Sequence, residues 1–369
     1  HETLHKLNIF HNVFVWESEI VQNKLLDGAM NELENKEILI EGTEKYEGCK
    51  IVKFSDNEKF KNMLDADKVF IRANGVATYT AKDIAFQMWK FGIINKKIKF
   101  EELYTKKNEE KLYSSNVKGK EIEFNNCYKI INVIGMEQKY PQEVIKTTLE
   151  LAGYEQAQNY VHLSYGHAKL ADVKFSGRKG TWMGYTVDEV LSESISRAYE
   201  LINEKFKEYS QEEKEKISNS VGIGALRYSF IKINPEREII FEWDKALNFE
   251  GDSGPYLQYS YARALHILQK VKTANVKHKV TSEYEKELIK KMYEFEDIII
   301  VSSENVTPNK IAEYALELCS AFNSFYANCH VVNENDNEIK NTRKKIVELF
   351  TEKLGFCLDI IGVPKIERM

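Results

Sequence analysis

The pattern of apolar residues changes near residue 220. Before it, short runs typical of strands (VFVWES, EILIEG, KIVKF, KVFIRANG) precede the helical segment YTAKDIAFQMWKFG, which is expected to end at Gly92. Beyond it the strand pattern fades, and helical periodicity covers 256–272, 281–299, 308–330 and 337–358. Alternating strands and helices indicate an α/β domain, and successive helices indicate a bundle. We therefore predict an α/β domain over 1–220 and a helical bundle over 221–369.

Three further segments add detail to the prediction for the α/β domain. YKIINVIGM is an apolar run of strand length, expected to be a buried parallel strand, and the helical PQEVIKTTLELAGY follows it. Residues 96–126 are rich in lysine and glutamate, so we expect an exposed excursion there. Thr186 and Glu189 have the spacing of a capping box at the start of a long amphipathic helix.

Composition narrows the class of protein. The chain has 369 residues, 43% hydrophobic and 30% charged, which is globular composition and favours two domains. Its formal net charge of −5 argues against coating nucleic acid by bulk charge, although 270–279 and 340–345 could form local basic faces. The five cysteines are scattered without a Cys-x-x-Cys pair, which indicates reduced thiols in the cytosol. No apolar run reaches membrane-spanning length.

A basic, glycine-containing loop, VKFSGRKGTW, stands out in this acidic chain. Backbone amides freed by glycine, together with Lys174, Arg178 and Lys179, could surround a phosphate and stabilise negative charge that develops on it. The loop lacks the G-x-x-x-x-G-K-[ST] pattern of a P-loop. Composition alone leaves an ordinary solvated loop as the alternative.

Tyr79 and Asp83 are four residues apart at the start of a predicted helix and therefore share a face. The carboxylate could bind an ammonium or a guanidinium. The alternative is structural: Thr80 would be the N-cap, and Asp83 at the third helical position would simply favour the helix N-terminus.

Three other patterns each allow a structural alternative. HETLH, at residues 1–5, matches the zinc motif H-E-x-x-H, but no third ligand accompanies it, and we predict no bound structural metal. His162 is isolated, and an isolated histidine is more often structural. Aromatic residues lie near the EGDSGP loop and in the predicted helix 308–330. They could stack on RNA bases or pack in the hydrophobic core: Tyr256, Tyr259, Tyr261, Phe322, Phe325 and Tyr326.

In their order, these segments resemble the arginine–tRNA ligases, class I aminoacyl-tRNA synthetases, over nearly the whole chain. VFIRANGVATYTAKDIAFQMWKFG is similar to the family's arginine-binding strand, loop and helix, and YVHLSYG, KFSGRKG and TVDEVL resemble the end of its catalytic domain. VGIGALRYSF through YARALHIL, LELCSAFNSFYANC and LDIIGVPKIERM resemble its helical anticodon-binding domain. The resemblance implies a partial Rossmann-like catalytic domain over 1–220 and an all-α anticodon-binding bundle over 221–369.

The resemblance also implies roles for particular residues. KFSGRKG resembles the class I Lys-Met-Ser-Lys loop, with Phe175 at the methionine position and Gly177 at that of the second lysine. The implied catalytic residues are Lys174, Ser176, Arg178 and Lys179. The implied arginine-binding residues are Tyr79, Asp83 and Gln138. The implied ATP contacts are His162, Leu163, Lys174, Phe175 and Ser176, and the implied anticodon contacts are Tyr256, Tyr259, Tyr326 and Met369.

The implied activity is ATP-dependent attachment of L-arginine to its tRNA through arginyl-adenylate. Mg²⁺ would accompany the triphosphate, and the enzyme would be a cytoplasmic monomer. The family's His-Ile-Gly-His motif and N-terminal domain are absent from this sequence. We therefore expect the chain to begin midway through the catalytic domain, with HETLH a helix cut by that start, and to be inactive alone.

Two other interpretations stay open. A non-catalytic relative of the ligase would bind tRNA or a protein partner without catalysis. Another class I ligase, such as the cysteine enzyme, would carry a zinc-type cysteine set, which this sequence lacks.

Overall fold

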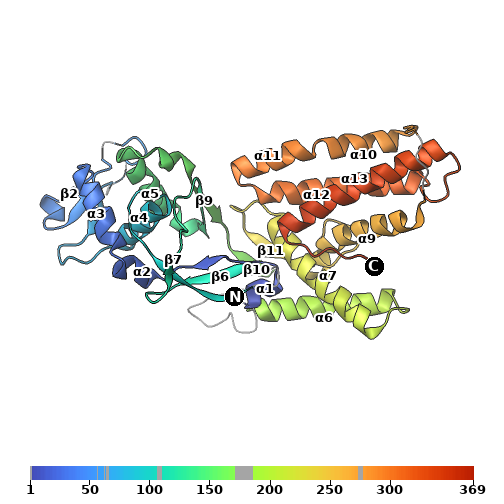
Figure 1. The fold of residues 1–369 in the computed structure, drawn as a ribbon, viewed down its shortest axis with the longest axis horizontal. Helices are drawn as coiled ribbons and strands as arrows, with labels where there is room; N and C mark the ends of the chain where they lie inside the picture. Colours follow the sequence, from blue (N-terminus) through green and yellow to red (C-terminus); the bar gives the residue numbers. More distant parts are fainter. Residues whose placement is uncertain are drawn as a thin grey trace. The chain divides into compact units, whose positions relative to one another are not determined.

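The computed structural model describes residues 2–55, 57–61, 63, 66–105, 110–170, 186–272 and 277–369. The chain divides into two compact units, here called the N-terminal unit (11–165) and the C-terminal unit (1–10 with 166–369). Figure 1 shows their elements. The predicted domain boundary near residue 220 lies inside the C-terminal unit, and it stays a prediction. Among the described helices, none is long and apolar enough to cross a membrane.

An antiparallel sheet in the order β2-β3-β4 lies in the N-terminal unit. Its strands fall inside three of the predicted runs, which confirms them, and two short helices precede the sheet. The elements are α2 (Glu17–Gln22), α3 (Leu25–Asn35), β2 (Leu39–Glu41), β3 (Lys50–Val52) and β4 (Lys68–Ile71).

A second sheet shows that the expectation for 96–126 was incomplete. Strands β5 (Lys99–Thr105), β6 (Lys111–Ser115) and β7 (Lys120–Glu121) join β1 (Val13–Phe14) in the order β1-β6-β5-β7. Phe100 and Leu112 are only 1% and 0% exposed, while most of the charged residues on these strands face solvent. The segment is an antiparallel β5–β6 hairpin, and β7 pairs with the other edge of β5. Apolar side chains anchor it, and its charged residues cover the outer side.

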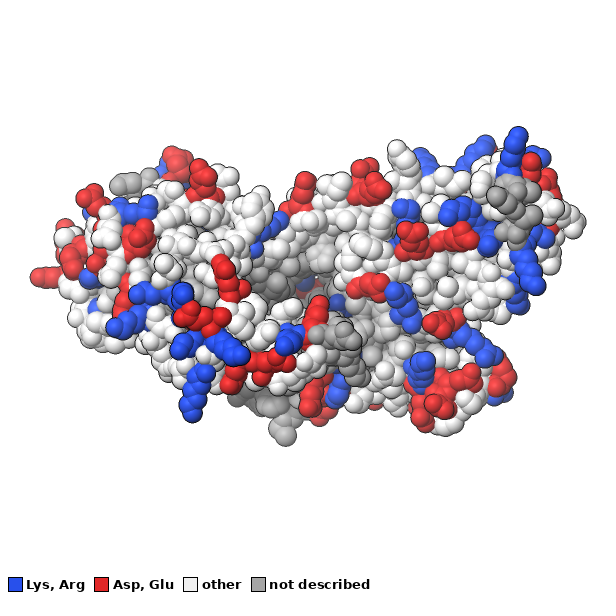
Figure 2. Space-filling view, viewed as in Figure 1, with Lys and Arg blue, Asp and Glu red and all other residues white. Residues whose placement is uncertain are grey.

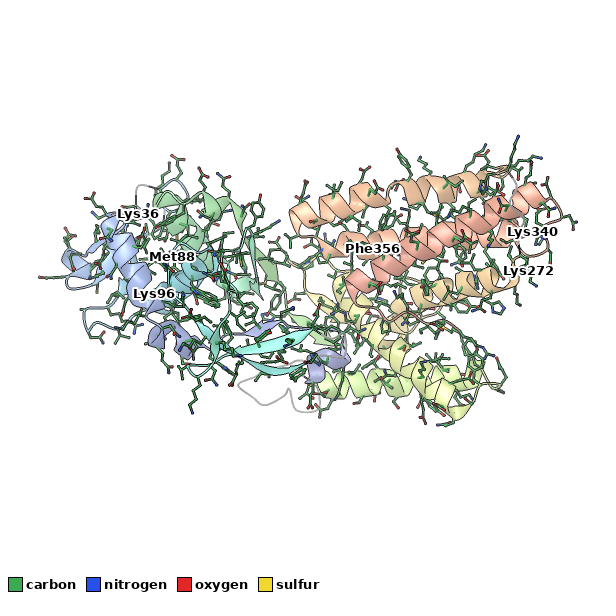
Figure 3. All side chains as sticks on the ribbon, viewed as in Figure 1. Lys36, Met88, Lys96, Lys272, Lys340 and Phe356 are labelled. Atoms are coloured by element: carbon green, nitrogen blue, oxygen red, sulfur yellow. The ribbon has the colours of Figure 1, made fainter. Side chains whose placement is uncertain are left out.

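Helix α4 (Tyr79–Lys90) forms the centre of the N-terminal core. Its buried face includes Ile84 and Met88, and Figure 3 shows Met88 in the interior of this unit. The helix ends before Gly92, whose φ of 72° is the left-handed geometry that favours glycine. The predicted N-cap, Thr80, was wrong: the side chain of Thr78 accepts the hydrogen bond from Ala81 N, at 3.3 Å.

Strands β8 (Ile130–Gly135) and β9 (Tyr160–Tyr165) form a parallel pair in which Ile130 is opposite Tyr160. They are connected through η2 (Met136–Gln138), α5 (Lys139–Leu151) and η3 (Glu155–Asn159). The parallel arrangement confirms the prediction for YKIINVIGM, but burial is on one face only. Ile130 is 4% exposed and Val133 is 62% exposed, because successive side chains point to opposite faces.

The C-terminal unit begins with short elements and two long helices. Strands β10 (Ala168–Leu170) and β11 (Ile239–Phe241) pair in parallel. The predicted capping box at Thr186 and Glu189 is confirmed at the start of α6, and Ser210 and Glu213 form another at the start of α7. The remaining elements here are α1 (Glu2–Lys6), α6 (Val187–Lys205), α7 (Gln211–Ile231) and α8 (Trp243–Ala246).

A bundle of five helices completes this unit in the described part of the chain (Figure 1). Three of the four predicted helices are confirmed, whereas 281–299 covers one whole helix and the start of the next. The rings of Phe322 and Phe350 stack at 3.9 Å between α12 and α13. The helices are α9 (Gly254–Lys270), α10 (Glu283–Tyr293), α11 (Phe295–Asn305), α12 (Pro308–Asn328) and α13 (Asn337–Ile361).

A buried ion-pair group connects α10 and α13. Arg343 Nε donates to Glu285 Oε1 at 2.6 Å, and Arg343 Nη1 donates to Glu334 Oε2 at 2.7 Å. Nη1 also donates to the carbonyl of His330 at 2.7 Å. Glu285 is 0% exposed and Arg343 is 8% exposed. Charges this deeply buried require one another, because neither can be solvated by water.

Candidate functional sites

Asp83 is the fifth residue of α4, so it does not take the third helical position that the structural alternative required. Its carboxylate is half-buried, and the described hydrogen bonds and ion pairs include none to it. Burial raises the pKa of Asp83 above its usual value, and the negative charge of Glu17 adds to this, while Lys90 and Lys82 oppose it. A half-buried carboxylate without a partner is available to bind a cation.

Tyr79 is the first residue of α4 and is 78% exposed. It precedes Asp83 by four residues, so the two side chains lie on one face of the helix, as predicted. Lys82 Nζ is 5.6 Å from the Tyr79 ring centroid and pairs with Glu17 Oε1 at 2.8 Å. An aromatic face beside a carboxylate suits a flat guanidinium, which can stack and pair at once.

The other predicted contacts of the N-terminal unit lie on β8, η2 and β9. His162 Nε2 is 3.1 Å from the carbonyl oxygen of Ile134, so it links the two strands. Leu163 is half-buried beside it, and Gln138 is exposed at the end of η2. Because β8 and β9 are parallel, Gln138 follows the edge where their carboxyl ends meet, which is where α/β sheets bind ligands. The described contacts include none that joins Gln138 to Asp83.

Sequence reasoning missed a polar network behind Asp83. Lys90 Nζ donates to Asn132 Oδ1 at 3.2 Å. Asn132 Nδ2 donates to Gln142 Oε1 at 2.9 Å and to Tyr160 Oη at 2.7 Å. Burial lowers the pKa of Lys90 to about 8, against the opposing effects of Cys127 and Asp83. The sequence did contain a sign of this network. Lys90 follows Asp83 by seven residues and therefore lies on the same side of the helix, directly after the apolar residues Met88 and Trp89.

The basic loop cannot be placed. Its residues Lys174, Phe175, Ser176, Arg178 and Lys179 all lie outside the described part of the chain. Their catalytic and ATP-binding roles stay predictions.

A second candidate site lies between α9 and α12. The Arg263 guanidinium carbon is 4.5 Å from the Tyr259 ring centroid and 4.7 Å from that of Tyr326. Arg263 Nη1 donates to Asn323 Oδ1 at 2.7 Å, and Asn323 Nδ2 donates to Tyr256 Oη at 2.8 Å. The three predicted tyrosines therefore form one cluster. Sequence reasoning missed Arg263 and Asn323, which connect them.

The loop before α9 fixes the start of this cluster. Asp252 accepts hydrogen bonds from Tyr228 Oη at 2.6 Å and Lys232 Nζ at 3.0 Å, and Ser253 Oγ accepts one from Tyr256 N at 3.2 Å. A Cβ on Gly254 would lie 2.2 Å from the backbone oxygen of Gly224, so only glycine lets α9 approach α7 this closely. The EGDSGP loop thereby sets the position of Tyr256.

The remaining aromatic residues divide between surface and core. Phe322 and Phe325 are completely buried, while Tyr326 is 44% exposed. Met369 packs against the hydrophobic cluster that contains Ile366, and the described contacts include none between it and Tyr326. Its role as a wall of a base pocket stays a prediction.

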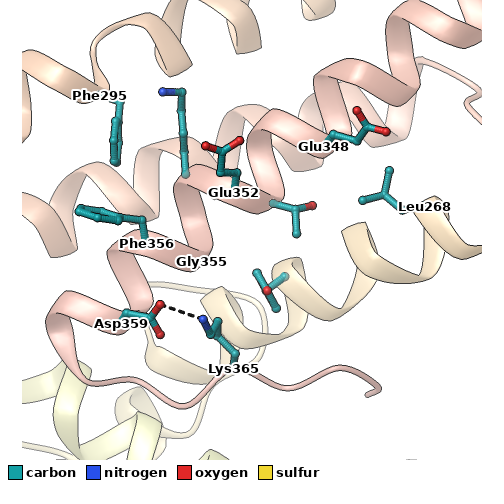
Figure 4. Close-up of a pocket in the computed structure, with 11 residues that line it drawn as sticks. Leu268, Phe295, Glu348, Glu352, Gly355, Phe356, Asp359 and Lys365 are labelled. Carbon is teal, nitrogen blue, oxygen red and sulfur yellow. Dashed lines mark hydrogen bonds and ion pairs between the residues drawn. The ribbon is translucent and has the colours of Figure 1, made fainter.

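Two surface regions of the bundle differ in charge. A cavity of about 520 Å³ on α9, α11 and α13 is lined partly by Glu348, Glu352 and Asp359, and Asp359 pairs with Lys365 at 2.8 Å (Figure 4). Lysines of the two predicted basic runs, including Lys272 and Lys340, lie at one end of the bundle (Figure 3), where blue side chains gather in Figure 2. Lys353 and Lys365 also line the cavity, so it carries charges of both signs, whereas the basic end favours phosphate.

Two family models cover most of this architecture. Residues 114–243 match tRNA synthetases class I (R), catalytic domain, and residues 257–369 match the DALR anticodon binding domain. The protein thus has a class I tRNA synthetase catalytic region followed by a helical anticodon-binding domain, which confirms the predicted fold class.

Similar proteins of known function identify the family within the class I synthetases. The whole chain aligns at 41% identity with the arginine–tRNA ligase of Pyrococcus abyssi and at 34% with that of Thermus thermophilus. The solved Thermus thermophilus arginyl-tRNA synthetase matches the whole chain and 62% of its own, with a TM-score of 0.90 and 32% identity. The chain belongs to the arginine–tRNA ligase family, and it spans 59% and 62% of the two curated relatives.

Proposed function

We propose that this chain supplies the arginine-binding and anticodon-binding parts, and a portion of the ATP site, of an arginine–tRNA ligase. The enzyme would join L-arginine to its tRNA at the expense of ATP. The observation that carries the proposal is the half-buried Asp83 carboxylate, which has no partner in the described structure and lies one turn from the exposed Tyr79 ring. Family membership supports the same activity.

In this proposal Asp83 accepts hydrogen bonds from the guanidinium of arginine, and the Tyr79 ring covers its flat face. Gln138 approaches from the carboxyl end of β8, where an amide can orient the polar end of the amino acid. The site would therefore favour a side chain that is both positively charged and planar. The ammonium of lysine carries the charge, but it cannot pair with both carboxylate oxygens in one plane and stack on the ring as a guanidinium does.

The chemistry proceeds in two transfers. The arginine carboxylate attacks the α-phosphate of ATP and pyrophosphate leaves, and then a ribose hydroxyl at the tRNA terminus attacks the carbonyl and AMP leaves. His162 and Leu163 contact the adenosine, and Lys174, Ser176, Arg178 and Lys179 stabilise the charge on the departing pyrophosphate. Mg²⁺ would enter with the triphosphate, as class I membership implies.

The tyrosine cluster would read the anticodon. Unpaired RNA bases stack on aromatic and guanidinium planes, and Arg263 already lies between two tyrosine rings at stacking distance. A base that enters between Tyr259 and Tyr326 would replace or extend this stack.

We place the protein in the cytoplasm as a monomer.

Calorimetric titration with L-arginine and L-citrulline tests the amino-acid site. Citrulline has nearly the same shape but carries a neutral urea in place of the guanidinium. The chain should bind arginine about five- to tenfold more tightly, because hydrogen bonds to charged groups are stronger than neutral ones by roughly 1–1.4 kcal/mol. Equal binding of both, or binding of neither, contradicts the proposal for Asp83.

A tRNA titration tests the tyrosine cluster separately. Tyr259→Leu should weaken binding of arginine tRNA by about 1–3 kcal/mol at fixed salt, the scale of one stacked base. The same substitution should cost little with a tRNA whose middle anticodon base is changed. Tyr293→Leu, at an 87% exposed tyrosine outside the cluster, is the matched control. A loss that is equal for both tRNAs would argue against base reading by Tyr259.

The two titrations separate this proposal from a non-catalytic tRNA-binding relative. Such a relative would respond to Tyr259→Leu but would have no reason to distinguish arginine from citrulline.

A further inference from the structure

Lys90 lies on the same stripe of α4 as the carboxylate that we propose binds arginine. Asp83, Gln87 and Lys90 are spaced at i, i+4 and i+7, which places them along one side of the helix over two turns. Gln87 is 5% exposed, and its Oε1 atom has no partner among the described groups. The stripe is therefore polar within a helix that is otherwise buried against the core.

The ammonium group of Lys90 is held in place. Its Nζ donates to Asn132 Oδ1 at 3.2 Å and lies 4.8 Å from the Phe86 ring centroid. The amide of Asn132 is fixed in turn by Gln142 and Tyr160, and Tyr160 Oη donates to Gln142 Oε1 at 2.6 Å. These three side chains are at most 9% exposed, so the network leaves the amide oxygen of Asn132 oriented toward Lys90.

Few charged groups affect Lys90 and Asp83. The groups that affect the pKa of Lys90 are Cys127, in the segment before β8, and Asp83. Those that affect the pKa of Asp83 are Glu17 on α2, Lys82 and Lys90, and Asp83 acts on Tyr160 of β9. Helices α3 and α5 also contact α4, and they carry carboxylates that pair elsewhere: Glu34 with Lys50, and Glu143 and Glu150 with Lys59. Among the described residues, Asp83 is thus the one carboxylate that affects the pKa of Lys90.

We propose that Lys90 is a positioning residue for the amino-acid site, a fixed internal countercharge that keeps the Asp83 carboxylate ionised while the site is empty. This inference rests on the proposed function, because it takes Asp83 as the group that binds the substrate cation. Lys90 itself does not touch the substrate. Its ammonium reaches back along α4 to the Phe86 ring, 4.8 Å from the ring centroid and one turn from Asp83. Among the described groups it forms no ion pair that the guanidinium would have to break.

A double-mutant cycle tests the pairing without any ligand. Melting temperatures of the 369-residue chain at pH 7 are measured for D83N, K90M and the double variant. K90M should lower the melting temperature more in the native background than in the D83N background, because only the former leaves an uncompensated carboxylate. A cycle of D83N with K97M is the control, since Lys97 is exposed and pairs with Glu121. Equal effects of K90M in both backgrounds would overturn the proposal.

The pH profile of arginine binding provides the second test. Arginine affinity falls on acidification as Asp83 becomes protonated, and without Lys90 this fall should begin about one pH unit higher. K90R should restore the native profile, because it keeps the charge; a purely structural role would change affinity at every pH alike. An unshifted K90M profile contradicts the proposal. Absence of arginine binding in the native chain would refute the proposed function, and the ligand-free cycle would still decide the pairing.

Discussion

Replacing Asp83 by asparagine will weaken binding of L-arginine about 30- to 100-fold, as loss of roughly 2–3 kcal/mol of charged hydrogen bonding requires. Asparagine keeps the shape of the side chain but removes the charge that the guanidinium needs. Calorimetric titration at pH 7 measures this directly. Unchanged affinity would show that Asp83 is not the cation-binding group.

The same substitution should leave the fold as stable as before, or more so. The pKa of Asp83 is raised in the folded chain by burial and by Glu17. A carboxyl group with a raised folded pKa contributes stability at low pH and loses that contribution as the pH rises through its folded pKa. At pH 7 the ionised group therefore opposes folding, and asparagine removes this opposition.

Thermal unfolding between about pH 4 and pH 8 measures the effect. The D83N variant should gain in relative stability as the pH rises. Asp67→Asn is the matched control, because Asp67 Oδ1 accepts hydrogen bonds from the backbone of Phe54 and Ser55 at 2.9 and 3.1 Å. The control should lower stability. A D83N variant that melts earlier than the native chain at pH 7 would contradict the account of Asp83 as an unpartnered carboxylate.

Replacing Arg343 by methionine will lower the free energy of unfolding of the helical bundle by about 3–5 kcal/mol. Methionine fills a similar volume, so the loss comes mainly from charge. Glu285 is completely buried, and without Arg343 its carboxylate would keep only the backbone amides of Thr281 and Ser282. Urea denaturation followed by the helical circular dichroism signal measures the change.

A second substitution separates charge from packing in this group. E285Q in the R343M background should recover part of the lost stability, because a buried amide costs less than an unpaired carboxylate. Arg368→Met is the control at an exposed pair, in which Arg368 Nη1 is 3.3 Å from Glu213 Oε1. It should cost less than about 1 kcal/mol. An R343M effect as small as the control would mean that the buried group is not stabilised by its charges.

Features that depend on neighbouring residues were predictable from the sequence. The capping box at Thr186 and Glu189 requires only residues three apart, and the parallel strand at Ile130–Gly135 follows from an apolar run before a helix. The break between α10 and α11 was missed because no glycine or proline marks it and apolar periodicity continues across Glu294. The choice of Thr78 over Thr80 as N-cap was also missed, since two threonines stand two residues apart.

The candidate sites were only partly predictable, because each combines segments distant in sequence. Tyr79 and Asp83 share a helix, so their common face followed from spacing alone. Arg263 and Asn323 are 60 residues apart, and nothing in either segment reveals that they meet. The same holds for Asn132 and Tyr160, whose contact depends on strand register.

The discontinuity of the C-terminal unit has a consequence for synthesis on the ribosome. Helix α1 is translated before residues 11–165, but its partners follow them: Thr3 and Lys6 bond to Asp188 at 2.6 and 2.9 Å, and Asn8 bonds to the carbonyl of Gly362 at 3.3 Å. The N-terminal unit can collapse around α4 before these partners of the first residues have been translated. These three contacts therefore form only after the whole N-terminal unit has been translated, and a nascent chain halted before residue 188 would lack all of them.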